Sequence, residues 1–179
     1  MSLHEKYLPV YDFSEHHRLD IKAPAEVVAN CVEAASFSDS FLIKLLTRLR
    51  GMPRTQGGIE SVTRMGFVLL ERDAGREVIL GLIGQFWKPS GNIIRVGSAV
   101  DFERFNEDSF LKATWNFAVR ETTMDSSVLE TETRIQCLGT YAKRKFSRYW
   151  FFIRPFSGLI RMEMLRSIRR KAEAEAFAT

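Results

Sequence analysis

The C-terminal stretch from Lys143 to Ala176 constrains this chain most, because its apolar residues recur every three or four positions. That spacing places them on one stripe of an α-helix. The stripe consists of Phe146, Trp150, Ile153, Phe156, Ile160, Met164, Ile168 and Ala172. Pro155 lacks a backbone donor and is expected to kink or split the helix, and Gly158 softens the same region. A helix with so wide an apolar face needs a broad partner surface, which a sheet from the rest of the chain can supply.

Length and composition bound the class of protein. A chain of 179 residues, 45% hydrophobic and 27% charged, predicts one soluble globular domain spanning 1–179, with its core at about 14–176. No apolar run approaches the roughly 20 residues that a membrane span needs. Cys31 and Cys137 lie far apart and form no CxxC motif, which favours a reducing compartment and hence the cytoplasm. The sequence leaves a disulfide between them open.

Basic charge is concentrated in the same C-terminal stretch. Residues 143–171 hold ten basic residues and one acidic residue, a net charge of +9, whereas the whole chain carries +4. The residues expected opposite the apolar stripe are Arg144, Arg148, Arg166, Arg169 and Arg170. A solvated helix back is the favoured interpretation, and a weak contact with an anionic membrane surface stays open. No nucleic-acid partner is predicted, because no known binding motif accompanies the charge.

The first part of the chain predicts a strand followed by two short helices. Residues 14–22 alternate between apolar and polar, which indicates a half-buried strand. The side expected to be buried carries His17, Leu19 and Ile21. Pro24 followed by Glu26 is typical of a helix N-terminus. The apolar spacing over 41–49 predicts a second short helix.

The middle of the chain predicts a meander of strands. These strands are expected near 65–72, 77–87, 98–105, 110–121 and 128–138. The loops between them are mostly of hairpin length, so the strands should be antiparallel neighbours. Alternation directs Leu111 and Leu129 toward the helix, and Asn116 and Glu130 toward solvent. The predicted fold class is α+β: about six or seven antiparallel strands with one solvated face and the other face under the C-terminal helix.

Four segments carry a resemblance to a known superfamily. They are IKAPAEVV (21–28), LKATWNF (111–117), TETR (131–134) and RYWFFIRPFSGLIR (148–161). Over about 14–173 the chain resembles the helix-grip superfamily, which includes START lipid-transfer domains, birch-pollen allergens and bacterial polyketide cyclase/dehydrase-like proteins. The resemblance implies a curved sheet wrapped on the C-terminal helix, with a cavity beneath that helix for an apolar ligand. It implies no particular reaction, because members range from binders to cyclases.

The strongest acid–base candidate is His17, which the alternation directs toward the helix. The competing interpretation is a core histidine bonded to a backbone carbonyl, and this one is favoured. His16 should face the other side of the strand, so the two histidines make a poor metal pair. No metal or cofactor is predicted, because no HxxxH motif, CxxC motif or carboxylate cluster supports one.

The cavity that the resemblance implies would be lined by large or hydroxyl-bearing residues expected to face inward. The predicted ligand-binding residues are Trp87, Phe102, Trp115, Phe117, Thr131, Thr133, Trp150 and Ile153. The hydroxyls of Thr131 and Thr133 need hydrogen-bond partners, such as each other, water or a ligand. Tryptophan suits pocket walls and cores equally.

Three functions are compatible with these observations. Binding or transport of a small hydrophobic molecule is favoured, because few ionisable groups are expected to face inward. The second is an enzyme of the polyketide cyclase/dehydratase type, using His17 with a hydroxyl or carboxylate on an apolar or aromatic substrate. The third is a membrane- or partner-associated module that uses the basic helix face. The sequence identifies neither the ligand nor the oligomeric state.

Overall fold

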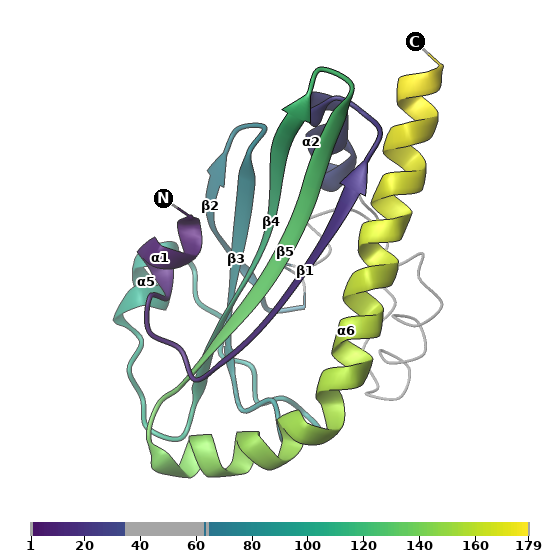
Figure 1. Ribbon diagram of the computed structural model, residues 1–179. Helices are drawn as coiled ribbons and strands as arrows, with labels where there is room; N and C mark the ends of the chain where they lie inside the picture. Colours follow the sequence, from purple (N-terminus) through teal and green to yellow (C-terminus); the bar gives the residue numbers. More distant parts are fainter. Residues whose placement is uncertain (1, 35–62, 64, 179) are drawn as a thin grey trace.

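The computed structural model describes residues 2–34, 63 and 65–178 (Figure 1). The strands are β1 (Phe13–Ile21), β2 (Val68–Asp73), β3 (Glu77–Gly84), β4 (Leu111–Thr123) and β5 (Ser126–Cys137). The helices are α1 (Leu3–Tyr7), α2 (Ala25–Glu33), α5 (Ala99–Arg104) and α6 (Thr140–Phe177). The short helix predicted at 41–49 lies outside the described residues.

The five described strands form one antiparallel sheet in the order β1-β5-β4-β3-β2. Tight turns join β2 to β3 and β4 to β5, as the hairpin-length loops predicted. The first strand pairs with the last, placing His17 opposite Thr131 and Leu19 opposite Leu129. This register aligns the inward side chains of β1 with those of β5.

One face of the sheet lies under α2 and α6 (Figure 1). We call it the grip face; it carries the odd-numbered residues of 13–21, 111–119 and 127–137. Its buried core includes Ile21, Val28, Leu80, Phe117, Leu129 and Leu165. The alternation predicted for β1, β4 and β5 is therefore confirmed on this face.

The opposite face, the back face, is covered over its β2–β3–β4 part, whereas Ser14, His16, Arg18 and Asp20 of β1 are exposed on it. Helices α1 and α5 pack on it (Figure 1). Lys112, Asn116 and Arg134 are accordingly buried, so the prediction of a solvated face is wrong for the covered part and holds along β1. With only five residues, α1 is too short for its apolar spacing to be recognised. Ser2 marks its start, because the Ser2 hydroxyl accepts a hydrogen bond from the backbone N–H of His4.

The strand predicted at 98–105 is instead helix α5. The Ser98 hydroxyl accepts from the backbone N–H of Asp101 at 3.2 Å and donates to its carboxylate at 2.7 Å. This cap is a helix-start signal that outweighs the apolar pattern. The described sheet consequently has five strands, not six or seven. Phe102 lies fully buried on the back face, with its ring 4.9 Å from the Lys112 ammonium.

Helix α6 runs for 38 residues without interruption at Pro155. It bends instead of splitting (Figure 1), as a proline inside a helix causes. Most of the predicted apolar stripe is buried or half-buried. Phe156 is the exception at 53% exposed, because the contact stripe shifts along the bent helix and Arg161 and Leu165 lie on its buried side. The α+β architecture is thus the helix-grip arrangement, a curved antiparallel sheet against a long C-terminal helix.

A polar network joins α1 to the back face. The His4 imidazole is fully buried, with Nδ1 2.9 Å from the Thr114 hydroxyl and Nε2 4.0 Å from the Glu132 carboxylate. The Glu77 carboxylate accepts hydrogen bonds from Ser2, Leu3 and Asn116. Burial lowers the pKa of His4 from 6.5, although Glu132 opposes that shift. His4 therefore holds α1 on the sheet as a neutral group.

We expect acid to destabilise the protein partly through His4. The unfolded chain binds the His4 proton at pKa 6.5, whereas the folded protein resists it. The contribution of neutral His4 is therefore complete above pH 6.5 and is lost as the pH falls through the folded-state pKa. In His4→Asn, which does not titrate, the unfolding free energy should fall less steeply with acid. Urea unfolding across pH measures this, with exposed His16→Asn as the control; parallel curves for wild type and His4→Asn would contradict it.

Candidate functional site

The grip face carries a cluster of polar side chains near the middle of α6. In the sheet register, Glu15 of β1 lies opposite Thr133 of β5, and Thr133 lies opposite Trp115 of β4. In the next row, His17 lies opposite Thr131. The Trp115 indole donates to the Thr131 hydroxyl at 2.8 Å, and that hydroxyl donates to the backbone carbonyl of Asn116 at 2.6 Å. Two rows of one sheet thus gather a carboxylate, an imidazole and two hydroxyls.

Arg161 of α6 completes this cluster. Its Nε lies 3.9 Å from Glu15 Oε2, and its guanidinium carbon lies 5.1 Å from the centre of the Trp115 ring. On the other side of the carboxylate, His17 Nε2 lies 3.3 Å from Glu15 Oε1. The side chains of Glu15, His17 and Arg161 are 8%, 21% and 15% exposed. The cluster is therefore largely enclosed but still reaches solvent through His17 and Arg161.

Gly158 allows α6 to lie close above these groups. A Cβ at this position would come within 2.8 Å of Glu15 Oε1 and 3.4 Å of His17 Cε1. Glycine inside a helix costs about 1 kcal/mol relative to alanine. Gly158, one turn before Arg161, therefore does not serve helix stability. It is explained by the close approach of the helix backbone to the Glu15–His17 pair.

The charge of Arg161 persists under the helix. Burial lowers the pKa of Arg161 to about 10, and the Glu15 carboxylate acts in the opposite direction. A guanidinium with this pKa remains protonated at neutral pH, so Glu15 and Arg161 form a largely buried ion pair. At 3.9 Å it is longer than a direct hydrogen bond, which leaves room for these groups to contact something else.

Several polar atoms of the cluster lack hydrogen-bond partners among the described residues. They are Glu15 Oε2, His17 Nε2, Thr133 Oγ1 and Arg161 Nε. Buried polar atoms in proteins are nearly always bonded, and leaving one unsatisfied costs about 1–3 kcal/mol. Both acceptors and donors are represented, so water or a ligand with polar atoms can satisfy them.

The structure gathers some of the predicted site residues and separates others. His17 lies with Trp115, Phe117, Thr131 and Thr133 on the grip face. Trp87 and Trp150 belong to a neighbouring cluster around Phe146, at the start of α6, and Ile153 is half-buried on the same helix. Phe102 lies on the back face and does not join them.

Sequence reasoning missed Glu15 and Arg161. Glu15 is two residues before His17 on β1, so the alternation that directs His17 toward the helix directs Glu15 there as well. Arg161 precedes Leu165 by four residues and Ile168 by seven, which is the spacing of the buried stripe of α6. In both cases the spacing indicated a buried position, but the residue at that position is charged and was therefore not counted as buried.

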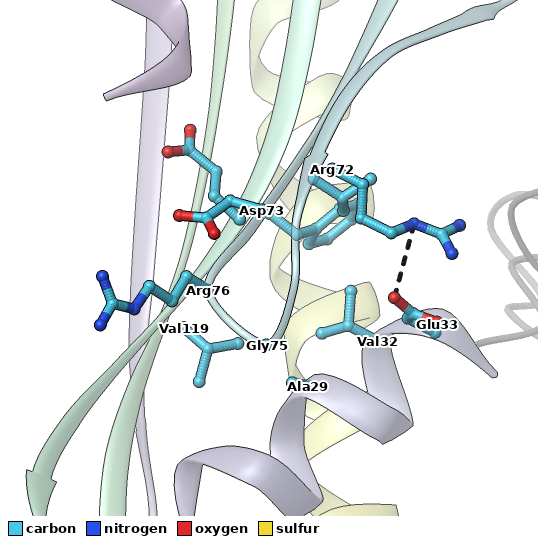
Figure 2. Close-up of a pocket in the computed structure, with 11 residues that line it drawn as sticks. Ala29, Val32, Glu33, Arg72, Asp73, Gly75, Arg76 and Val119 are labelled. Atoms are coloured by element: carbon cyan, nitrogen blue, oxygen red, sulfur yellow. Dashed lines mark ion pairs between the residues drawn. The ribbon is translucent and has the colours of Figure 1, made fainter. Parts of the chain in front are cut away.

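Away from this cluster, a small hollow lies between α2 and the β2–β3 hairpin (Figure 2). Ala29 and Val32 of α2 line one side of it, and an ion pair of 3.5 Å joins Arg72 to Glu33 beside it. Its volume of about 20 Å³ is comparable to the space that a single water needs. It is too small for an organic ligand in this conformation.

Neither cysteine is suited to nucleophilic chemistry. Cys31 and Cys137 are both free. Burial raises the pKa of the Cys31 thiol to about 11 and that of Cys137 to about 12, so both are protonated at neutral pH.

Among the described residues no three or more His, Cys, Asp or Glu side chains are grouped to bind a metal. Within the same residues, no helix combines the length and apolar character needed to span a bilayer.

No protein-family model matches the chain, and no curated protein sequence matches it. Solved structures that resemble it include norcoclaurine synthase from Thalictrum flavum in complex with dopamine and hydroxybenzaldehyde, at 16% identity and a TM-score of 0.42 over 91% of this chain and 87% of that one. A hypothetical protein of Helicobacter pylori aligns at 9% identity and a TM-score of 0.43, over 94% of this chain and 93% of that one. CalU16 from Micromonospora echinospora aligns at 15% identity and a TM-score of 0.34, over 90% of this chain and 84% of that one. At these values the likeness carries no information about activity.

Proposed function

We propose that the protein binds a small, mostly apolar molecule between the grip face and α6, with a polar group of that molecule at the Glu15–His17–Arg161 cluster. The supporting observation is the set of donor and acceptor atoms that make no hydrogen bond within the described residues, gathered at one place on an otherwise apolar surface. Trp115 and Phe117 offer aromatic contacts beside them, with ring centres 5.0 Å apart. A hydroxyl group suits the cluster best, because it can donate to Glu15 Oε2 and accept from Arg161 Nε without adding a net charge, whereas a carbonyl can only accept.

The first experiment is native mass spectrometry of freshly purified protein, followed by organic extraction of any bound compound. We expect an added mass that extracts as an apolar molecule bearing oxygen. If the protein is bare, calorimetric titration with hydroxylated and carbonyl-bearing aromatic compounds replaces the extraction. A bare protein that also binds none of these compounds would contradict the proposal.

Thr133→Val tests the site itself. The exchange removes a buried hydroxyl that has no partner among the described residues and keeps the shape of the side chain. We expect unfolding free energy to be unchanged or higher, because an unsatisfied group is lost, while ligand affinity falls by about tenfold, the equivalent of one lost hydrogen bond. Thr114→Val, also buried but on the back face, is the control for affinity: it removes the partner of His4 and should lower stability, yet leave affinity unchanged. Undiminished affinity in Thr133→Val would place the ligand elsewhere.

A second function, acid–base catalysis on an apolar or aromatic substrate, is favoured by one observation. His17 Nε2 faces the Glu15 carboxylate at 3.3 Å, and His17 makes no hydrogen bond to backbone within the described residues. A carboxylate beside an imidazole can orient it for proton transfer. His17→Gln should then abolish conversion even at concentrations of the compound that saturate the variant. Binding without any conversion by wild type would leave the binding function alone.

A further inference from the structure

The outer side of the first half of α6 exposes large apolar side chains. Phe151 and Phe152 are 77% and 71% exposed, and Leu159 is 60% exposed. We call this the aromatic–basic surface; it comprises Tyr141, Arg144, Lys145, Arg148, Phe151, Phe152, Arg154, Phe156 and Leu159. Single exposed apolar residues are ordinary, but five large ones on a single helix segment are a feature of interaction sites.

Much of this surface follows one line along the helix. Its residues Tyr141, Lys145, Arg148, Phe152, Phe156 and Leu159 are spaced three or four apart. That spacing stacks them on one side of an α-helix. The buried side carries Ala142 and Phe146, which face the sheet. The first half of α6 is thus apolar on two sides, one packed against the protein and one facing outward.

The charge of this surface is entirely positive. Residues 141–159 contain five basic residues and no acidic residue. Lys143 forms an ion pair with Asp12 at 2.7 Å. In the part of the chain that the structure describes, the other four cations, Arg144, Lys145, Arg148 and Arg154, have no carboxylate partner. Their charge is available to an external anion.

We propose that the aromatic–basic surface docks the protein on an anionic lipid bilayer. Aromatic and aliphatic side chains enter the boundary between headgroups and acyl chains, while Lys and Arg extend to the anionic headgroups. Nucleic acid fits less well, because the phosphate backbone offers nothing to an aliphatic side chain such as Leu159. The proposal rests on exposure and charge alone, and so does not depend on the function proposed above.

Vesicle co-sedimentation tests it with the full chain. We expect binding to vesicles of phosphatidylcholine mixed with phosphatidylserine, little binding to phosphatidylcholine alone, and release as salt is raised well above about 0.1 M. Phe151→Ser combined with Phe152→Ser should weaken binding by at least tenfold, roughly the loss of two inserted side chains. Lys145→Glu combined with Arg148→Glu should also weaken binding by at least tenfold, because two cations of this surface are replaced by anions.

The control is Arg166→Glu combined with Lys171→Glu, which makes the same charge change on the exposed side of the second half of α6. It should retain binding within about threefold, because attraction to the membrane decays within a Debye length. Equal loss in both charge variants would show nonspecific attraction and overturn the proposal, as would no binding to anionic vesicles. Self-association that Phe151→Ser with Phe152→Ser abolishes, without vesicle binding, would assign the surface to a second copy instead. Circular dichroism confirms that each variant is folded.

Discussion

Replacing Glu15 by leucine is expected to lower the free energy of unfolding by about 3 kcal/mol. The substitution leaves the Arg161 guanidinium under α6 without its counter-charge, which lies 3.9 Å away in the native protein. Losing one partner of a buried pair costs about 3–5 kcal/mol, and the 15% exposure of Arg161 places the effect at the lower end. Urea unfolding monitored by circular dichroism measures the change.

The double variant Glu15→Leu with Arg161→Met supplies the control. It removes both charges and keeps apolar volume in their place, so most of the lost stability should return. Equal instability of the single and double variants would show that lost packing, rather than an unpaired charge, is responsible. Arg166→Met, exposed on the same helix, should change stability by less than about 0.5 kcal/mol.

If the double variant is as stable as the wild type, the fold itself does not need the pair. An apolar pair of similar volume often stabilises a protein as well as a buried ion pair does. The charges, together with the unpartnered Thr133 hydroxyl, would then have to be explained by something that the site contacts. This reasoning favours a functional role for Glu15 and Arg161, and it connects the stability measurement to the ligand-binding proposal.

The sheet and the long helix were predictable because their patterns are long. The alternation runs through β1 and through most of β5, and it predicted which side of each strand carries His17, Thr131 and Thr133. The kink expected at Pro155 follows from ring geometry alone, and a bend is what occurs. Local chemistry repeated over many residues was therefore enough for the architecture.

The short helices and the site's charged members were not predicted, for physical reasons. Helix α1 has five residues and α5 has six, so their starts are marked by Ser2 and Ser98 caps rather than by periodicity. Because these helices cover the back face, Asn116 and Arg134 are buried where alternation alone predicts exposure. The ligand-binding roles assigned to residues such as Trp115 and Ile153, and the extent of the domain, stay predictions.

Replacing Phe146 by alanine is expected to lower the free energy of unfolding by about 3–5 kcal/mol, the cost of emptying a large buried aromatic site. Phe146 is 1% exposed and forms the centre of the cluster that holds the first half of α6 against the sheet. Its ring centre lies 5.2 Å from that of Phe13, 5.6 Å from that of Trp150 and 5.8 Å from that of Tyr149. Urea unfolding gives the change directly.

Phe151→Ala and Phe152→Ala are the matched controls, since they delete the same ring from the exposed side of the same helix. Each should alter stability by no more than about 0.5 kcal/mol. If Phe146→Ala is no more costly than these, the first half of α6 is not docked on the sheet as described. A large loss for Phe146 with none for Phe151 and Phe152 would show that only the inner apolar side of α6 stabilises the fold. The inner side would hold the fold together, and the outer side would be free to meet a partner such as an anionic membrane.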